Sequence, residues 1–210
     1  KTDVAEVGFL GRTLLNAFNA LEYGSLQNRS ELVKDANNIF ETYLSHGFSP
    51  AGFFNEVVRF HRDSKESNFS IRRQSEGVYA ILSYLDYEKK HKRKHVEWEK
   101  RLKVILDNFL RIQKADGSFP RKFKDDFSIV DSTGGSTPSV TLPLVMAYKY
   151  FNDKRYLESA KRSANYLENE IISKSDYFSS TLDANCEDKE ASLYAATATY
   201  YLALVIKGSE

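Results

Sequence analysis

The stretch RIQKADGSFPRKF, from Arg111 to Phe123, ends one helical pattern before another can begin. Its Asp-Gly pair, followed by Phe-Pro, is typical of a helix end and a turn. Two similar endings, LSHGF at 44–48 and ISKSDYF at 172–178, also close a helical pattern and finish in Phe. Their irregular spacing indicates a repeated helical unit joined by loops of variable length.

Composition limits the classes of protein to which the chain can belong. With 210 residues, of which 41% are hydrophobic, it is long enough for one domain with a sizeable core. Lys and Arg (30) nearly cancel Asp and Glu (29), so no overall field attracts nucleic acid or an anionic membrane. Cys186 is the only cysteine, which excludes an internal disulfide and a cysteine-based zinc site. We expect no metal, no cofactor and no nucleic-acid partner.

Hydrophobic periodicity predicts seven helices and only weak strand signals. In the even-numbered helices the apolar residues recur on one face, as Ile105, Leu106 and Phe109 do, with charges opposite. In the odd-numbered helices apolar residues occupy nearly every side, so we expect these helices to be enclosed by protein. The predicted ranges are 4–23, 29–45, 72–90, 95–114, 138–151, 153–173 and 188–207.

This alternation predicts an all-α fold of antiparallel hairpins in two layers, with buried helices inside and half-buried helices outside. The connections alternate too. Short turns lead from a buried helix to a half-buried one, and long loops, at about 47–71, 115–137 and 174–187, lead back. Because each hairpin reverses the chain, the long loops should meet at one end of the bundle, which is the expected functional face.

Two glycines stand where half-buried helices end. Gly47 and Gly117 predict left-handed backbone at both positions, because glycine is the usual residue in that conformation after a helix. The Phe residues that follow, Phe48 and Phe119, are expected to pack back on their hairpins.

The ending from Gln113 to Phe119, together with FNDKRYLESA at 151–160 and ANYL at 164–167, resembles the (α/α)-barrel, or six-hairpin, glycosidases and polysaccharide lyases of polysaccharide-degrading bacteria. Terpene-cyclase and prenyltransferase toroids share a similar element, but the sequence has no aspartate-rich motif. A complete barrel needs twelve helices, and this chain supplies about seven. The resemblance therefore implies a single hairpin domain over 1–210, and either the barrel is incomplete or this domain is part of a longer chain that supplies the other hairpins. It also implies a periplasmic or extracellular location, although these residues include no targeting segment.

Acidic residues at the start of the last helix are the main catalytic candidates. Glu187, Asp188 and Glu190 can cap that helix, because carboxylates accept hydrogen bonds from the free amides of a first turn. One of them can instead be a general acid or base, since glycoside hydrolysis usually needs two carboxyls about 5–10 Å apart. A neighbouring loop brings Asp131 toward the same end. We predict Asp188, Glu190 and Asp131 as catalytic residues, and Glu187 in substrate binding.

Arg72 and Arg73 begin a helix rich in buried residues, where a cation needs an anion nearby. One interpretation is an ion pair with the acidic cluster at 187–190. The other is recognition of a uronate carboxylate, which the guanidinium fork matches. Glu76, one turn later, is either their partner or an acceptor for a sugar hydroxyl. We include these three residues among the predicted substrate-binding groups.

Aromatic residues are frequent in the long loops, where they either pack into the core or stack on sugar rings. We predict Phe127 and Tyr194 in substrate binding. Tyr194 is one of the tyrosines on buried helices that can line a cavity, with Tyr79 and Tyr148. A lyase would need such a phenol, or a histidine such as His61, near the proton it removes. The loop aromatics are Phe53, Phe54, Phe119, Phe123, Phe127 and Tyr177.

Three functional hypotheses follow from these residues and from the resemblance. The first is a carbohydrate-active protein that cleaves an oligosaccharide, which can contain uronic acid, by hydrolysis or elimination. The second is a non-catalytic glycan-binding or scaffold domain of a larger polysaccharide-degrading protein. The third, an isoprenoid-cyclase-like toroid, predicts a deep and mainly aromatic cavity. No apolar run reaches the roughly 20 residues of a membrane span. The oligomeric state is not determined by the sequence.

Overall fold

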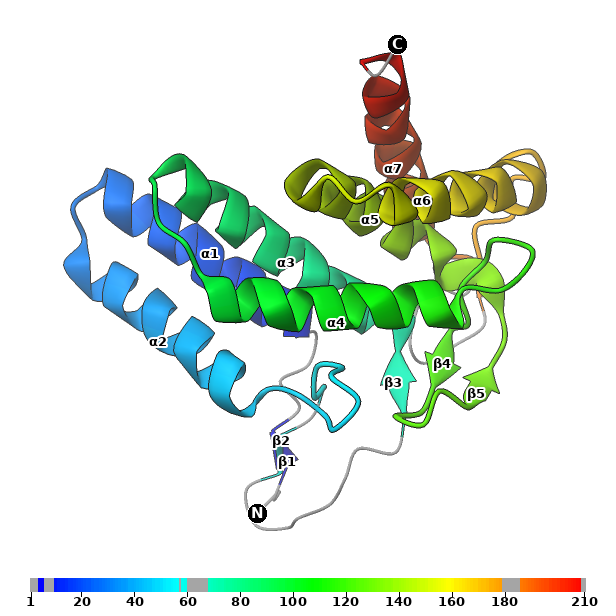
Figure 1. Cartoon of the computed structure of the whole chain (residues 1–210). Coiled ribbons are helices and arrows are strands. Elements are labelled where there is room, and N and C mark those ends of the chain that lie inside the picture. The colour runs from blue at the N-terminus through cyan, green and yellow to red at the C-terminus, as the bar shows by residue number, and fades with distance from the viewer. Residues whose placement is uncertain (1–3, 6–9, 57, 60–67, 179–185, 209–210) are drawn as a thin grey trace.

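The computed structural model describes residues 4–5, 10–56, 58–59, 68–178 and 186–208, and Figure 1 shows how they are arranged. Helices account for most of these residues, close to the ranges that the periodicity predicts. A short 3-10 turn at Gly134–Ser136 precedes α5, and α6 continues as a wide π-helical segment over Leu167–Ile172. The α-helices are α1 (Leu10–Leu26), α2 (Ser30–His46), α3 (Ile71–Lys90), α4 (Val96–Ile112), α5 (Thr137–Phe151), α6 (Lys154–Tyr166) and α7 (Lys189–Lys207).

The helices form two layers, with α1, α3, α5 and α7 on the inside and α2, α4 and α6 on the outside (Figure 1). Helix α3 packs between α1 and α5, and α5 packs between α3 and α7. The outer helix α2 covers α1, and α6 covers α5. This arrangement confirms the predicted fold, because one-faced helices lie outside and the mostly apolar α3 and α5 lie within.

Connections between the helices also follow the prediction. Short turns join α1 to α2, α3 to α4 and α5 to α6, and Figure 1 shows them toward one end of the bundle. The described parts of the long loops lie toward the other end, next to the first turns of the inner helices. The functional face expected from loop length is therefore also the end where inner helices begin.

The loops contain short strands that the periodicity does not predict. A helix is expected from residue 4, but Val4–Ala5 form β1, which pairs antiparallel with β2 (Val58–Arg59), so that expectation is wrong. In a second sheet β3 (Phe69–Ser70) pairs with β4 (Lys122–Phe123), and β4 pairs with β5 (Ile129–Asp131), both antiparallel. Strands of two or three residues are too short to show an alternating pattern, so only their tertiary contacts define them.

The two glycines at helix ends behave differently. Gly117 has φ +88°, which confirms the left-handed backbone predicted there. Gly47 has φ −87°, so the same prediction is wrong for that residue. A side chain is excluded at Gly47 for another reason, because a Cβ would lie 2.6 Å from the carbonyl oxygen of Tyr43. The following Phe residues do pack back: Phe119 is fully buried, and Phe48 lies partly buried against the core.

Aromatic side chains from the long loops enter the core. Phe53, Phe54, Phe119 and Phe123 are all fully buried, which is the core-packing alternative for these residues. The ring centroids of Phe53 and Phe123 lie 4.8 Å apart, so they join the loop after α2 to the loop after α4. These contacts hold the long loops across the starts of the inner helices.

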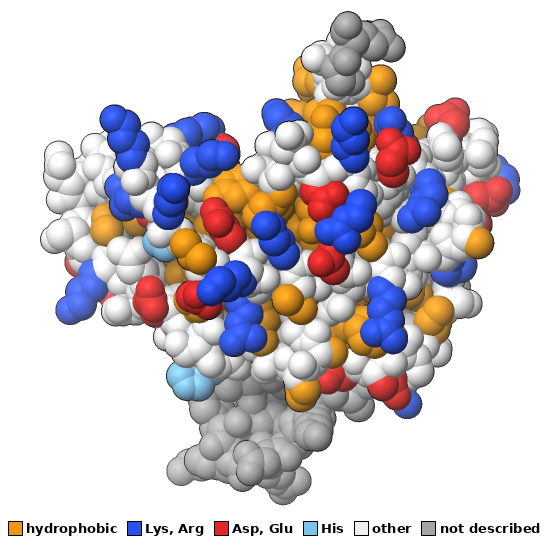
Figure 2. All heavy atoms as spheres, in the orientation of Figure 1, with side chains coloured by type: hydrophobic (Ala, Val, Ile, Leu, Met, Phe, Trp, Pro, Cys, Tyr) orange, Lys and Arg blue, Asp and Glu red, His pale blue; other side chains and the backbone are white. Residues whose placement is uncertain are grey.

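The last inner helix, α7, is not enclosed as its apolar sequence predicts. Figure 1 shows it projecting from the other helices, and it packs mainly against α5. Leu193 is 66% exposed and Leu204 is 50% exposed. Figure 2 shows hydrophobic side chains on the projecting part. An apolar helix is enclosed only where neighbours exist on both sides, and the described residues supply α7 with one inner-layer neighbour.

Within the described residues, no helix is both long enough and apolar enough to span a membrane.

Candidate functional site

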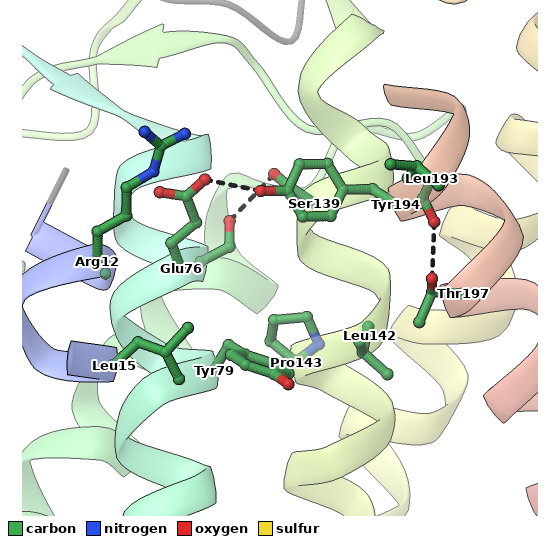
Figure 3. Close-up of a pocket in the computed structure, with 12 residues that line it drawn as sticks. Arg12, Leu15, Glu76, Tyr79, Ser139, Leu142, Pro143, Leu193, Tyr194 and Thr197 are labelled. Atoms are coloured by element: carbon green, nitrogen blue, oxygen red, sulfur yellow. Dashed lines mark hydrogen bonds between the residues drawn. The ribbon is translucent and has the colours of Figure 1, made fainter. Parts of the chain in front are cut away.

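A pocket of about 360 Å³ opens between the N-terminal halves of the four inner helices. Each of α1, α3, α5 and α7 contributes three residues to its wall. Figure 3 shows Arg12, Glu76 and Tyr194 toward one end of the pocket and the apolar or aromatic side chains of Leu15 and Tyr79 toward the other. The pocket therefore combines a polar end with an apolar wall, as sites for small ligands usually do.

Arg72 lies at the centre of a charged cluster beside this pocket. Its guanidinium contacts Glu76 (Nε to Oε1, 3.0 Å) and Asp188 (Nη1 to Oδ2, 3.6 Å), and its Nη2 donates a close hydrogen bond to Glu190. The Arg72 side chain is only 5% exposed. Arg12 of α1 reaches the other oxygen of Glu190 at 3.8 Å. The ion-pair interpretation is therefore confirmed for Arg72, whose guanidinium already faces protein carboxylates.

Tyr194 joins the cluster through its hydroxyl, which donates to Oε1 of Glu76 at 2.8 Å. Burial raises the pKa of Tyr194 well above its usual value, and the adjacent Glu76 carboxylate raises it further. Burial lowers the pKa of Arg72, but Glu76, Tyr194 and Glu190 raise it by more, so the net change is upward. Both groups therefore keep their protons at neutral pH, and the phenol acts as a hydrogen-bond donor.

The second carboxylate oxygen of Glu76 has a different environment. Oε2 is buried, and no hydrogen-bond donor among the described residues reaches it. Buried acceptors without a donor are uncommon, because a lost hydrogen bond to a charged group is costly. Since Glu76 lines the pocket, a donor on a bound ligand that reached Oε2 would satisfy this oxygen.

Local helix geometry places these groups together. Glu76 follows Arg72 by four residues in α3, so both side chains lie on the same face. Asp188 caps α7, because its Oδ1 accepts the backbone N–H of Glu190 at 2.9 Å. Gly11 lets α1 approach α3 closely, since a Cβ on that residue would lie 2.1 Å from the Cβ of Glu76. The capping interpretation of Asp188 is therefore confirmed, and the cap also contacts Arg72.

Arg73 belongs to a separate cluster. Its Nη1 lies 3.6 Å from Oε2 of Glu56, in the loop after α2. The other Glu56 oxygen accepts the backbone N–H of Ser70 at 2.7 Å and the side-chain amide of Gln74 at 2.9 Å. The expected ion pair with the start of α7 thus holds for Arg72 and not for Arg73. Successive helical residues point about 100° apart, so the two guanidinium groups reach different loops.

Asp131, a predicted catalytic residue, lies in β5 and is not part of the pocket wall. Its Oδ2 accepts a hydrogen bond from Arg121 at 3.1 Å, and its Oδ1 accepts the backbone N–H of Thr133 at 2.9 Å. Burial raises the pKa of Asp131, but the hydrogen bonds from Thr133 and Arg121 lower it by more, so the net change is downward. These contacts give Asp131 a structural role in the loop, and its catalytic role stays a prediction.

Like Arg72 and Arg73, the predicted substrate-binding residues Phe127 and Glu187 lie outside the pocket wall. Phe127 is half-buried, and the guanidinium carbon of Arg111 lies 3.7 Å from its ring centroid. Glu187 is exposed and lines a shallow hollow together with Tyr177. Contacts of these two residues with a substrate stay predictions. His61 lies outside the described residues.

Several residues of the pocket wall were not among the site residues predicted from the sequence. The predicted first helix starts at residue 4, which would put Arg12 in the middle of a helix. In the structure α1 begins at Leu10, so Arg12 lies in its first turn. Ser75 and Ser139 are small hydroxyl residues near the starts of α3 and α5, and that recurrence is a signal that could have found them, whereas Thr197 lies in the middle of α7. Tyr79 was predicted as a cavity-lining tyrosine, and the structure confirms it.

Among the described residues, no three His, Cys, Asp or Glu side chains are grouped to hold a metal ion.

No protein-family model matches this sequence, and no curated protein is significantly similar to it. The structure is similar to a possible GH105 family member from Salmonella enterica serovar Paratyphi A (TM-score 0.74, 13% identity, 99% of this chain and 58% of that one). It is also similar to a D-mannose isomerase (TM-score 0.74, 16% identity, 98% and 55%). A third similar structure is the unsaturated glucuronyl hydrolase from Bacillus sp. GL1 (TM-score 0.66, 12% identity, 92% and 54%).

The chain thus spans a little more than half the length of these structures. Identities of this size establish a fold and leave the chemistry open. The recurring hairpins, the two layers and these likenesses agree with one another. The chain has the (α/α)-barrel, or six-hairpin, fold over part of a barrel.

Proposed function

We propose that this chain forms part of a carbohydrate-active site and that a sugar binds in the pocket between the four inner helices. The observation that carries the proposal is the pocket itself, where Glu76 and Tyr194 face a wall containing Tyr79 and Pro143. Sugars present hydroxyl groups at their edges and apolar C–H groups on their faces, which suits such a wall. The similarity to structures named as sugar isomerases, epimerases and hydrolases supports this coarse assignment.

Within that class, hydrolytic cleavage is the reaction that the carboxylates favour. Hydrolysis of a glycosidic bond uses two carboxyl groups, one as an acid and one as a base or nucleophile. Glu76 lines the pocket, and Glu190 is linked to it through Arg72 and is 42% exposed. Asp188 is held by its cap and by Arg72, so in this proposal it positions the other two carboxylates. The pair Glu76 and Glu190 therefore carries the proposed chemistry.

Elimination by a lyase receives less support from the same groups. A lyase base must accept the proton that it removes, which a phenol does well only when it ionises easily. The raised pKa of Tyr194 keeps that phenol protonated, and its hydrogen is already donated to Glu76. An aromatic cavity of the isoprenoid-cyclase type also receives no support, because Tyr79 and Tyr194 are the only aromatic residues among the described residues that line this pocket.

The test is binding and turnover on a panel of mono- and oligosaccharides, with Glu76→Gln, Glu190→Gln and Asp188→Asn variants. We expect calorimetry to show that the wild-type protein binds a sugar of the panel. In Glu76→Gln, turnover should fall at least about a hundredfold, the usual contribution of a general acid or base. Glu97→Gln is the matched control, because that carboxylate is 65% exposed and pairs only with Lys100 among the contacts described. Unchanged turnover in all three site variants would overturn the hydrolytic assignment.

The glycan-binding or scaffold role remains the second candidate function. The observation in its favour is that Glu190 and Asp188 already form ion pairs with Arg12 and Arg72, and such pairs hold the carboxylates in fixed positions. Binding without turnover for every sugar on the panel would select this role. Absence of any sugar binding would exclude both functions.

A further inference from the structure

The hydroxyl groups that line the pocket present hydrogen-bond acceptors to a ligand more than donors. Each hydroxyl has one proton to give. Tyr194 donates its proton to Glu76 (2.8 Å), Ser139 donates to the carbonyl of Ser136 (2.8 Å), and Thr197 donates to the carbonyl of Leu193 (2.8 Å). Ser75 donates to the carbonyl of Ile71 in a close hydrogen bond. The hydroxyls of Ser75 and Ser139 also contact each other at 3.3 Å, so the lone pairs of Tyr194 and Thr197 are the ones that remain for a ligand.

Glu76 increases this excess of acceptors. Its Oε1 already receives Arg72 (3.0 Å) and Tyr194 (2.8 Å), whereas its buried Oε2 receives no donor from the described residues. A donor from the ligand at Oε2 would satisfy an oxygen that is otherwise buried at a cost. An acceptor placed at the same point would repel it.

The balance of charge points in the same direction. Around the polar end of the pocket, Arg12 and Arg72 face the carboxylates of Glu76, Asp188 and Glu190, which leaves one net negative charge among these groups. Each of these arginines already contacts at least one of these carboxylates. An anionic ligand would therefore enter a site where the neighbouring cations are engaged and the net charge opposes it.

We infer that the pocket selects a sugar that directs a hydroxyl or amino group toward Glu76, and that it discriminates against uronic acids. This inference rests on the proposed sugar-binding function and specifies the substrate class of the same site. Glu76 is the residue that determines the selection, through its buried Oε2. Amino sugars are the best ligands, because an ammonium group offers both donors and positive charge.

The experiment compares three methyl glycosides that differ only at carbon 6: the neutral hexoside, its 6-amino-6-deoxy analogue and the uronide. The series is measured in the gluco, galacto and manno configurations by calorimetry at pH 7 and low salt. In each configuration that binds, we expect the uronide to bind at least about tenfold more weakly than the neutral sugar, the effect of one charged hydrogen bond. The amino sugar should bind at least as tightly as the neutral one.

Two variants keep the inference falsifiable. In Glu76→Gln the preference for the amino sugar over the uronide should shrink by about tenfold, because a neutral amide supplies a donor as well as an acceptor. In Tyr194→Phe, which removes one donor from Glu76, the same preference should grow or stay unchanged. Circular dichroism checks that both variants are folded, and Glu97→Gln should behave like the wild type.

The outcomes separate this inference from the proposed function. Tighter binding of the uronide than of the neutral sugar would overturn the inference and leave sugar binding in place. An unchanged preference in folded Glu76→Gln would also overturn it. If no member of any series binds, the proposed function itself fails, and the inference fails with it.

Discussion

Gly11 shows how one missing side chain shapes the site. The residue is buried where α1 crosses the first turns of α3, and a Cβ there would lie 2.1 Å from the Cβ of Glu76 and 2.6 Å from its backbone carbon. Flexible side chains can move away from such an overlap, but helix backbone cannot. The position of Glu76 in the pocket therefore depends on the absence of a side chain at residue 11.

Replacing Gly11 with Ala tests this dependence. Ala gains about 1 kcal/mol over Gly in a helix, whereas overpacking costs about 1–3 kcal/mol. Because backbone atoms are involved, we expect the strain to dominate and the free energy of unfolding to fall by about 1–2 kcal/mol. Urea denaturation of the variant and the wild type measures this change in the free energy of unfolding. Gly208→Ala is the control, since its nearest neighbour would lie 3.3 Å away. A more stable Gly11→Ala variant would show that α1 is not packed this closely.

At the scale of elements, the turn between α3 and α4 depends on one buried carboxylate. Glu88 accepts hydrogen bonds from Arg93 (Nε to Oε2, 2.7 Å) and lies 2.7 Å from Nε2 of His95. The hydroxyl of Tyr84 lies 3.1 Å from the same histidine nitrogen. Burial raises the pKa of Glu88, but Arg93 and His95 lower it by more, so the net change is downward. The lowered pKa means that folding favours the ionised carboxylate.

Glu88→Gln should therefore destabilise the protein by about 1–3 kcal/mol at pH 7, the cost of lost charged hydrogen bonds. A lowered folded pKa stabilises the protein above the unfolded pKa of about 4.3. The difference from the wild type should shrink as the pH falls below that value and the folded carboxyl takes up its proton. Urea denaturation at pH 7 and pH 3 measures the difference in free energy of unfolding between the variant and the wild type.

The matched control for this turn is Glu97→Gln on the exposed side of α4, where the carboxylate pairs with Lys100 at 2.7 Å. Exposed pairs contribute little, so its effect should stay within about 0.5 kcal/mol at either pH. If Glu88→Gln resembled this control, the turn would not depend on the buried carboxylate.

Across the whole molecule, burial decreases from the centre of the inner layer to α7. Helix α3 has 13 buried residues among its 20, whereas α7 has four among its 19. Local opening is easiest where few apolar contacts must be broken. The free energy of local opening should therefore be highest in α3 and lowest in α7.

Hydrogen exchange followed by mass spectrometry tests this gradient. Peptides from α7 should exchange at least about tenfold faster than peptides from α3, a difference of about 1.4 kcal/mol in opening free energy. Peptides from α5, which packs between α3 and α7, should be intermediate. Equal protection of α3 and α7 at low protein concentration would contradict the gradient.

Several features of the fold could be predicted because they depend on neighbours in the sequence. Helix periodicity, helix ends and loop lengths are local properties, so the helices, their order in two layers and the end with the long loops were all predictable. The pairing of Arg72 with the acidic residues was one of two stated alternatives, and the capping role of Asp188 followed from its place before α7. The same reasoning failed at Gly47 and at residue 4, where contacts with other segments decide the backbone.

The sequence by itself determined that this protein is a two-layer bundle of hairpins with its polar residues at the starts of the inner helices. Only the tertiary structure decided which of those residues meet. It joined Arg72 to Glu190, 118 positions along the chain, and it directed Arg73 to Glu56 instead. It also exposed α7 and left Oε2 of Glu76, a residue of the pocket wall, buried without a donor from the described residues. The reason is physical: periodicity reports which face of a helix is apolar, whereas ion pairs and pockets depend on distances between segments that the sequence separates.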